Sequence, residues 1–215
     1  GDDCVIMPHV SILNGATIGA RNVIHQNTVI CAEPQSFHFE KGQKPHVVIG
    51  DDNVIRENVL IAGSNRTEDA TRIGHNNHLM NKVHIAHDVC IGDDYAILSS
   101  STIVQRGVRV GKFVLLQSGC RVKRDVIPYG IFGGNPAAYH GVNSKVITAV
   151  RPETDERLLR HIANAFRMIT AGNFSLEDAE IKIREQIPLS PEIDDITKFI
   201  TTSENGVIRY AEEKE

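Results

Sequence analysis

Aromatic residues are scarce in this sequence: they make up 5% of its 215 residues, and Trp is absent. Long apolar runs are missing as well, since none reaches the roughly 18 residues that a membrane-spanning helix needs. We therefore expect no membrane span, and we expect no signal peptide. The formal net charge of −4 lacks the basic excess of a nucleic-acid-binding surface, so we expect no nucleic-acid partner.

Cysteine is also uncommon, and its four residues never form a Cys-x-x-Cys pair: Cys4, Cys31, Cys90 and Cys120. This spacing excludes a disulfide-stapled scaffold. We expect reduced thiols in a cytoplasmic protein, because structural disulfides are rare in that compartment.

Aliphatic residues recur every six positions through the first part of the chain. Period six fits neither an α-helix nor a long strand; it predicts short strands joined by tight corners, three to a coil, that wind into a parallel β-helix. The aliphatic side chains then point inward and stack one coil apart, at about 4.8 Å. Such a narrow interior has no room for Trp, whereas a β-sandwich would show irregular spacing of roughly 8–12 residues and more aromatics. The expected inward residues are Ile6, Ile12, Ile18, Ile24, Ile30, Ile49, Ile55, Ile61, Ile73, Leu79, Ile85, Ile91, Ile97, Ile103 and, after a slip of one residue, Val110, Leu116 and Val122.

Two polar stretches interrupt the repeat, at residues 31–48 and 62–72. A repeat scaffold tolerates loops at its corners, and long loops in compact folds are often functional. The first stretch carries Phe37 and Phe39 in a basic, His-bearing segment, so we favour a functional role for it. For the second, a functional loop and an ordinary surface loop are equally open.

The periodicity becomes helical after Pro152. An apolar stripe predicts a first helix that ends near Gly172, and it consists of Leu158, Leu159, Ile162, Phe166 and Ile169. Ser175 followed by Asp178 predicts the N-terminus of a second helix near residues 176–187. Ser190–Pro191 predicts the start of a third helix.

Charge separates the two parts of the chain. Residues 151–215 carry a net charge of −5, against +1 for residues 1–150. We therefore predict a mainly β protein, with a β-helix over residues 1–150 and a helical domain over residues 151–215.

Histidine is abundant and clusters where His84 and His87 flank the inward Ile85. Both imidazoles should face outward from the β-helix. His87 could act as a general base beside Asp88, could bind a metal, or could be an ordinary surface residue. A metal site is disfavoured because it needs at least three convergent ligands, and His84-x-x-His87 supplies two. Cys90 lies beside an inward position, which argues against Cys–His nucleophilic catalysis.

Four segments resemble one family. They are IGDDNVIREN (49–58), HLMNKVHIAHDVCIG (78–92), DVIPYGIFGGNPAAYHGVN (125–143) and IANAFRMITAGNFSLEDA (162–179). They resemble the bacterial acyl-carrier-protein-dependent UDP-N-acetylglucosamine O-acyltransferases, which begin lipid A synthesis, and suggest a shorter, divergent member. The resemblance implies a left-handed β-helix, against the usual right-handed crossover. It also implies a homotrimer with active sites between neighbouring subunits.

The resemblance further implies roles for individual residues. His87 would be the general base on the sugar 3-hydroxyl, with Asp88 beside it, and His84 would line the substrate pocket. Asn135 and Arg151 match positions that contact the nucleotide-sugar. The acyl donor would be acyl carrier protein carrying a (3-hydroxy)acyl group, with no metal and no bound organic cofactor.

The chain departs from the family pattern in three places. Ser36 and His38 stand where the first loop usually has an Asp and a Lys for the sugar. The segment 62–65 replaces a His-Arg-Gly-Thr stretch. Gln105 to Gly107 replaces the Gly-His pair that supplies an oxyanion-binding amide. We assign Ser36, His38, Gln105 and Gly107 to substrate binding on this basis.

These departures leave two alternatives open. One is a coenzyme A-dependent acyltransferase that acts on a different sugar nucleotide. The other is a non-catalytic trimer that binds a nucleotide-sugar. If a carrier protein is the donor, its acidic surface should dock on basic side chains of the β-helix, at Lys112, Lys123 and Arg124.

Overall fold

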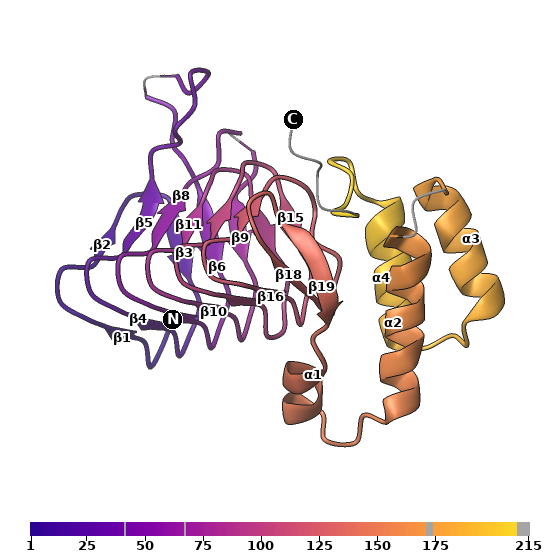
Figure 1. The fold of residues 1–215 in the computed structure, drawn as a ribbon. Helices are drawn as coiled ribbons and strands as arrows, with labels where there is room; N and C mark the ends of the chain where they lie inside the picture. The colour runs from indigo at the N-terminus through magenta and orange to yellow at the C-terminus, as the bar shows by residue number, and fades with distance from the viewer. Residues whose placement is uncertain (41, 67, 171–173, 210–215) are drawn as a thin grey trace.

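The computed structural model describes residues 1–40, 42–66, 68–170 and 174–209. Gly172, expected to end the first helix, lies outside the described residues, as do the last six residues of the chain. Figure 1 shows a stack of short strands over most of the chain, followed by a group of helices at one end.

Three parallel sheets form the walls of a β-helix, as the repeat predicts. The β-helix is left-handed, as the family resemblance implies. The first sheet contains β1 (Val5–Ile6), β4 (Val23–Ile24), β7 (Val54–Ile55), β10 (His78–Leu79), β13 (Ile97–Leu98), β16 (Leu115–Leu116) and β18 (Gly130–Gly133). The second contains β2 (Ser11–Ile12), β5 (Val29–Ala32), β8 (Leu60–Ala62), β11 (His84–Ile85), β14 (Ile103–Val104) and β17 (Arg121–Val122). The third contains β3 (Ala16–Ile18), β6 (Val47–Ile49), β9 (Thr71–Ile73), β12 (Cys90–Ile91) and β15 (Arg109–Val110).

The interior rows are aliphatic, as the period of six predicts. Ile24, Ile55 and Leu79 are fully buried and stack in successive coils of the first sheet. Ile6 and Ile12 occupy equivalent positions in the first coil but are 52% and 41% exposed, because no coil covers them at that end. The narrow β-helix therefore buries its core by stacking, and an inward side chain is fully buried only where a coil lies on each side of it.

The repeat shifts register earlier than we expected. Leu98 and Val104 are fully buried, whereas Ile103 is 41% exposed. The assignment of Ile97 and Ile103 to the interior is therefore wrong. The extra residue lies in the corner before β13, where Asp94 and Tyr95 both have positive φ, at 69° and 59°.

The aromatic residues of the β-helix gather at one corner and at its last coil. Tyr95, Phe113 and Tyr129 stack in successive coils, with ring centroids 5.6 and 5.7 Å apart. Phe132 ends one interior row and packs against Phe166 of the helical region. The scarcity of aromatics thus reflects the interior rows, which accept a large ring only at the end of the stack.

The helices begin close to their predicted positions. They are α2 (Glu156–Thr170), α3 (Leu176–Gln186) and α4 (Pro191–Thr201). Ser175 caps α3 by accepting a hydrogen bond from the Asp178 amide at 3.0 Å, and Ser190 caps α4. The stripe on α2 is confirmed, since Ile162, Phe166 and Ile169 are buried.

Two elements were not predicted. An antiparallel strand, β19 (Ala138–Val142), pairs with β18, and a short helix, α1 (Ser144–Val150), follows it. The division of the chain into domains at residue 150 stays a prediction. Across the described residues, no helix is both long and apolar enough to cross a membrane.

The corner that follows the third sheet packs too tightly for side chains. A Cβ at Gly50 would lie 2.7 Å from the Gly74 carbonyl oxygen, and one at Gly74 would lie 2.7 Å from the Asp93 amide. At Gly92 the nearest atom would be 3.3 Å away. Glycine follows the inward aliphatic residue here because adjacent coils approach so closely.

We predict that Gly50→Ala lowers the free energy of unfolding by about 1–3 kcal/mol through overpacking. Gly92→Ala is the matched control and should cost less, because its Cβ has more room. Urea unfolding curves of both variants test this. Equal costs would contradict the close approach of coils at Gly50.

Candidate active site

One corner of the β-helix, between the second and third sheets, carries nearly all the candidate residues. We define this loop corner as residues 33–46, 63–70, 86–89 and 105–108, which connect the two sheets in four successive coils. Both long loops rise from it, at the top of Figure 1. Because the strands pair in register, residues far apart in sequence lie side by side here.

His87 and Asp88 form a covered pair within this corner. The His87 Nδ1 and Asp88 Oδ2 atoms are 2.8 Å apart, and the two side chains are only 8% and 13% exposed. A carboxylate only accepts hydrogen bonds, so Nδ1 is the donor of this bond, and in the neutral ring the lone pair is on Nε2. His87 is therefore not a solvated surface residue, and its orientation is one that a general base acting through Nε2 would need.

Asp88 is itself held by three further features. Its Oδ1 accepts a hydrogen bond from the Asn65 amide at 2.9 Å, and its own amide donates to Thr71 Oγ1 at 3.0 Å. Its backbone has a positive φ of 60°, as a tight corner requires. The loop at 63–70 thus orients the carboxylate that orients His87.

His84 lies on the outer face of β11, half-buried, as the inward position of Ile85 predicts. Burial lowers the pKa of its imidazole below the ordinary value of 6.5. Burial therefore favours the neutral imidazole, which donates a hydrogen bond from one ring nitrogen and accepts one at the other.

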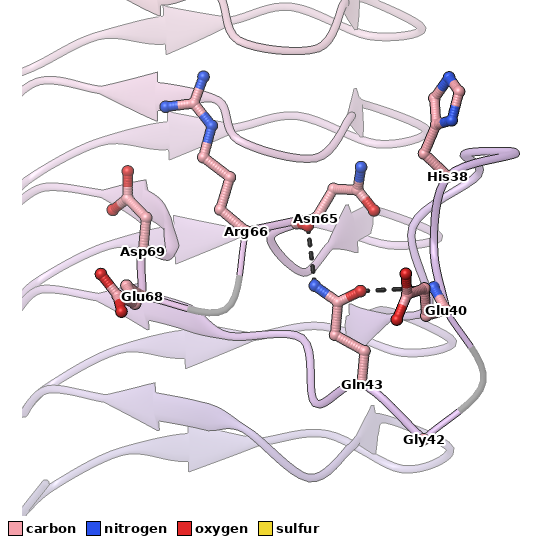
Figure 2. Close-up of a pocket in the computed structure, with 8 residues that line it drawn as sticks. All are labelled: His38, Glu40, Gly42, Gln43, Asn65, Arg66, Glu68 and Asp69. Carbon is pink, nitrogen blue, oxygen red and sulfur yellow. Dashed lines mark hydrogen bonds between the residues drawn. The ribbon is translucent and has the colours of Figure 1, made fainter.

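Ser36 and His38 lie on the first loop and approach the second. Ser36 Oγ accepts a hydrogen bond from the His38 amide at 3.2 Å and from Asn65 Nδ2 at 3.3 Å. Gln43 Nε2 donates to the Asn65 carbonyl at 2.8 Å, as Figure 2 shows. Asn65 therefore joins the first loop to Asp88.

A pocket of about 950 Å³ opens between these loops (Figure 2). Polar and charged side chains line it: His38, Glu40, Gln43, Asn65, Arg66, Glu68 and Asp69. Such a lining suits a hydroxyl-rich ligand better than an apolar one. Phe37 is fully exposed on the same loop.

The turn at residues 105–107 lies against His87. The Gly107 amide donates to the His87 carbonyl at 3.1 Å, and the Gln105 amide donates to the Val122 carbonyl at 3.0 Å. No hydrogen bond joins the Arg106 amide, which lies between them, to any other described residue. With its Oε1 turned toward Arg121, the Gln105 side chain accepts two hydrogen bonds from that guanidinium, at 3.0 and 3.1 Å.

Asn135 and Arg151 lie elsewhere. Asn135 is exposed in the turn between β18 and β19, beside β17. Arg151 pairs with Glu192 at 3.0 Å and stacks over the Phe113 ring at 4.8 Å. Within one chain, the structure does not bring either residue to His87.

Sequence patterns missed Asn65 and Thr71 as site residues. Asn65 acts through its backbone in a loop of no regular period, and Thr71 acts through a short side chain at the start of β9, so no motif marks either. Within the described ranges, no three His, Cys, Asp or Glu side chains converge to hold a metal ion.

We predict that His87 is an Nδ1–H tautomer. Nitrogen-15 NMR of the imidazole should show this form in the wild-type protein and a shift toward the Nε2–H form in Asp88→Ala, which lacks the acceptor. His75, whose Nδ1 accepts from the Asp51 amide, provides the opposite internal reference. An Nε2–H tautomer in the wild type would contradict the assignment of Nε2 as the base.

The fold and this corner define a class, the hexapeptide-repeat acyltransferases. The family model described as "Bacterial transferase hexapeptide (six repeats)" matches residues 1–32. A second model, described as "Udp N-acetylglucosamine O-acyltransferase; Domain 2", matches residues 125–208.

Similar proteins narrow the class to one family. The chain is 32% identical over 94% of its length to the acyl-(acyl-carrier-protein)–UDP-N-acetylglucosamine O-acyltransferase of Syntrophobacter fumaroxidans, and covers 84% of that protein. It is 30% identical to the Myxococcus xanthus protein of the same name, over 90% of this chain and 81% of that protein. A solved UDP-N-acetylglucosamine acyltransferase from Bacteroides fragilis superposes with a TM-score of 0.80 and 38% identity, over 97% of this chain and 88% of that one. The chain belongs to the UDP-N-acetylglucosamine O-acyltransferase family.

Proposed function

We propose that this protein transfers a (3-hydroxy)acyl group from acyl carrier protein to the 3-hydroxyl of UDP-N-acetylglucosamine or a related UDP-amino sugar. The His87–Asp88 pair is the observation that carries this proposal. The names of the curated relatives supply the donor and the acceptor.

The pair suits a general-base mechanism. Nε2 of His87 takes the proton of the sugar hydroxyl as its oxygen attacks the thioester carbonyl, and Asp88 stabilises the imidazolium that forms. The tetrahedral intermediate carries an oxyanion, for which the Arg106 amide is a donor, since it bonds to no other described residue. When the intermediate collapses, the C–S bond breaks, and the imidazolium returns its proton to the leaving thiolate.

A homotrimer would complete the site. The outward-facing residues of the first sheet form a half-buried row that is aliphatic except for His78, namely Val23, Val54, His78, Ile97, Leu115 and Ile131. Such a row favours packing against another copy of the chain. Within one chain, Asn135 and Arg151 lie away from His87. In a site shared by two chains, they could contact the nucleotide-sugar from the neighbouring chain.

His84, Ser36 and His38 are the proposed ligands of the sugar. Ser36 and His38 offer hydrogen-bonding groups where the family has an Asp and a Lys, and both lie on the loop that Asn65 links to Asp88. Gln105 and Gly107 contribute by shaping the turn, because their amides are engaged within the β-helix. We also propose that the chain divides into a β-helix over residues 1–150 and a helical domain over residues 151–215. We propose a cytoplasmic location for the protein.

The expected docking surface for the carrier protein needs one revision. Lys112 Nζ forms an ion pair with Asp195 at 2.8 Å, at a different corner from His87. Lys123 and Arg124 are exposed and lie one coil beyond the turn at 105–107. On position alone, we therefore propose Lys123 and Arg124 as the docking residues and leave out Lys112, which lies at a different corner from His87.

We predict that His87→Ala lowers kcat for acyl transfer from the carrier thioester by at least about 100-fold, since it removes the general base. His75→Ala is the matched control, because His75 also contacts an aspartate but lies at another corner. Both variants should keep the wild-type oligomeric state.

The same assay, run with a coenzyme A thioester, separates the alternatives. The proposal expects turnover with the carrier thioester at far higher kcat/KM. Faster turnover with coenzyme A would favour the second donor, and nucleotide-sugar binding without turnover by either donor would indicate a non-catalytic trimer.

A further inference from the structure

The segment after α4 returns to the last coil of the β-helix and is fastened to it. Asp125, whose side chain is 1% exposed, accepts hydrogen bonds from Ser203 Oγ and from Arg109 Nε, both at 2.9 Å. The Asp125 amide and carbonyl also bond to Gly206 and Ile208, each at 3.0 Å. We call residues 202–208 the C-terminal strap.

One side chain of the strap reaches the loop corner. Asn205 Nδ2 donates to the Gly107 carbonyl at 2.5 Å. The Gly107 amide donates in turn to the carbonyl of His87. A residue near the end of the chain is therefore linked, through one glycine, to the backbone of the proposed base.

Gly107 needs such support more than most residues do. Its φ of +69° is one that glycine reaches freely and leaves freely. The His87 carbonyl holds Gly107 from the coil below, and Asn205 holds it from outside the β-helix. The Arg106 amide precedes that of Gly107 in the chain, and it has no hydrogen bond to another described residue.

We infer that Asn205 is a positioning residue for acyl transfer. By holding the Gly107 carbonyl, it keeps the Arg106 amide aimed at the place where the oxyanion forms. This inference rests on the proposed function, because it needs an oxyanion at this turn.

The expected effect is selective. An oxyanion-binding amide works within a narrow range of distance, and it acts on a charge that exists only in the transition state. Loosening the turn should therefore lower kcat and leave KM for both substrates unchanged. The loss of one neutral hydrogen bond corresponds to about a three- to tenfold decrease.

The test compares Asn205→Ala with Ser203→Ala in the full-length protein. Asn205→Ala removes the hydrogen bond to Gly107 and a longer one, of 3.4 Å, to Asp125 Oδ1. Ser203→Ala removes a hydrogen bond to Asp125 alone, so it controls for the contact with Asp125. We expect the three- to tenfold loss of kcat in Asn205→Ala alone, with faster amide hydrogen exchange in the peptide spanning residues 103–109. Thermal unfolding should occur at similar temperatures in the two variants.

Several outcomes would overturn the inference. They are a wild-type kcat in Asn205→Ala, an equal loss in both variants, or a change confined to KM. His87→Ala keeps this test separate from the proposed function. If His87→Ala is inactive while Asn205→Ala is fully active, the positioning role fails and the general-base proposal stands. If the wild-type protein has no turnover, both fail.

Discussion

In-register stacking of coils is the constraint on which the rest of this structure depends. A parallel β-helix places each residue beside its equivalent in the next coil, at about the 4.8 Å strand spacing. The interior must then be filled by side chains of one size, which Ile24, Ile55 and Leu79 provide. The same stacking places the equivalent corner residues of successive coils side by side, whether they are glycines or functional residues.

The proposed active site lies along one such set of stacked corners, between the second and third sheets. His87 is two coils beyond the first long loop and one beyond the second, and the turn at 105–107 is in the coil that follows. Segments separated by roughly twenty residues therefore contact one another without any tertiary rearrangement. The repeat supplies the positions and the Thr71 contact at the start of β9, and the irregular loop at 63–70 supplies the Asn65 contact that orients Asp88.

Sequence reasoning was effective where the structure is periodic or capped by a known motif. The inward row, the caps at Ser175 and Ser190, and the pairing of His87 with Asp88 all follow from local patterns. It placed Ile97 and Ile103 in the interior wrongly. The extra residue lies in the corner before Ile97, whereas the spacing of the aliphatic residues fits a slip after Ile103 almost equally well. It could not place Arg151 or Asn205, whose contacts join elements about 40 to 100 residues apart and leave no periodic trace.

The central claim is that His87 and Asp88 act as one unit, with the carboxylate working only through the imidazole. A double-mutant cycle on kcat/KM for acyl transfer tests it most directly, using His87→Ala, Asp88→Ala and the double variant. The account predicts that Asp88→Ala lowers kcat/KM in the wild-type background and has almost no further effect once His87 is removed. Losses that multiply across the two positions would contradict it.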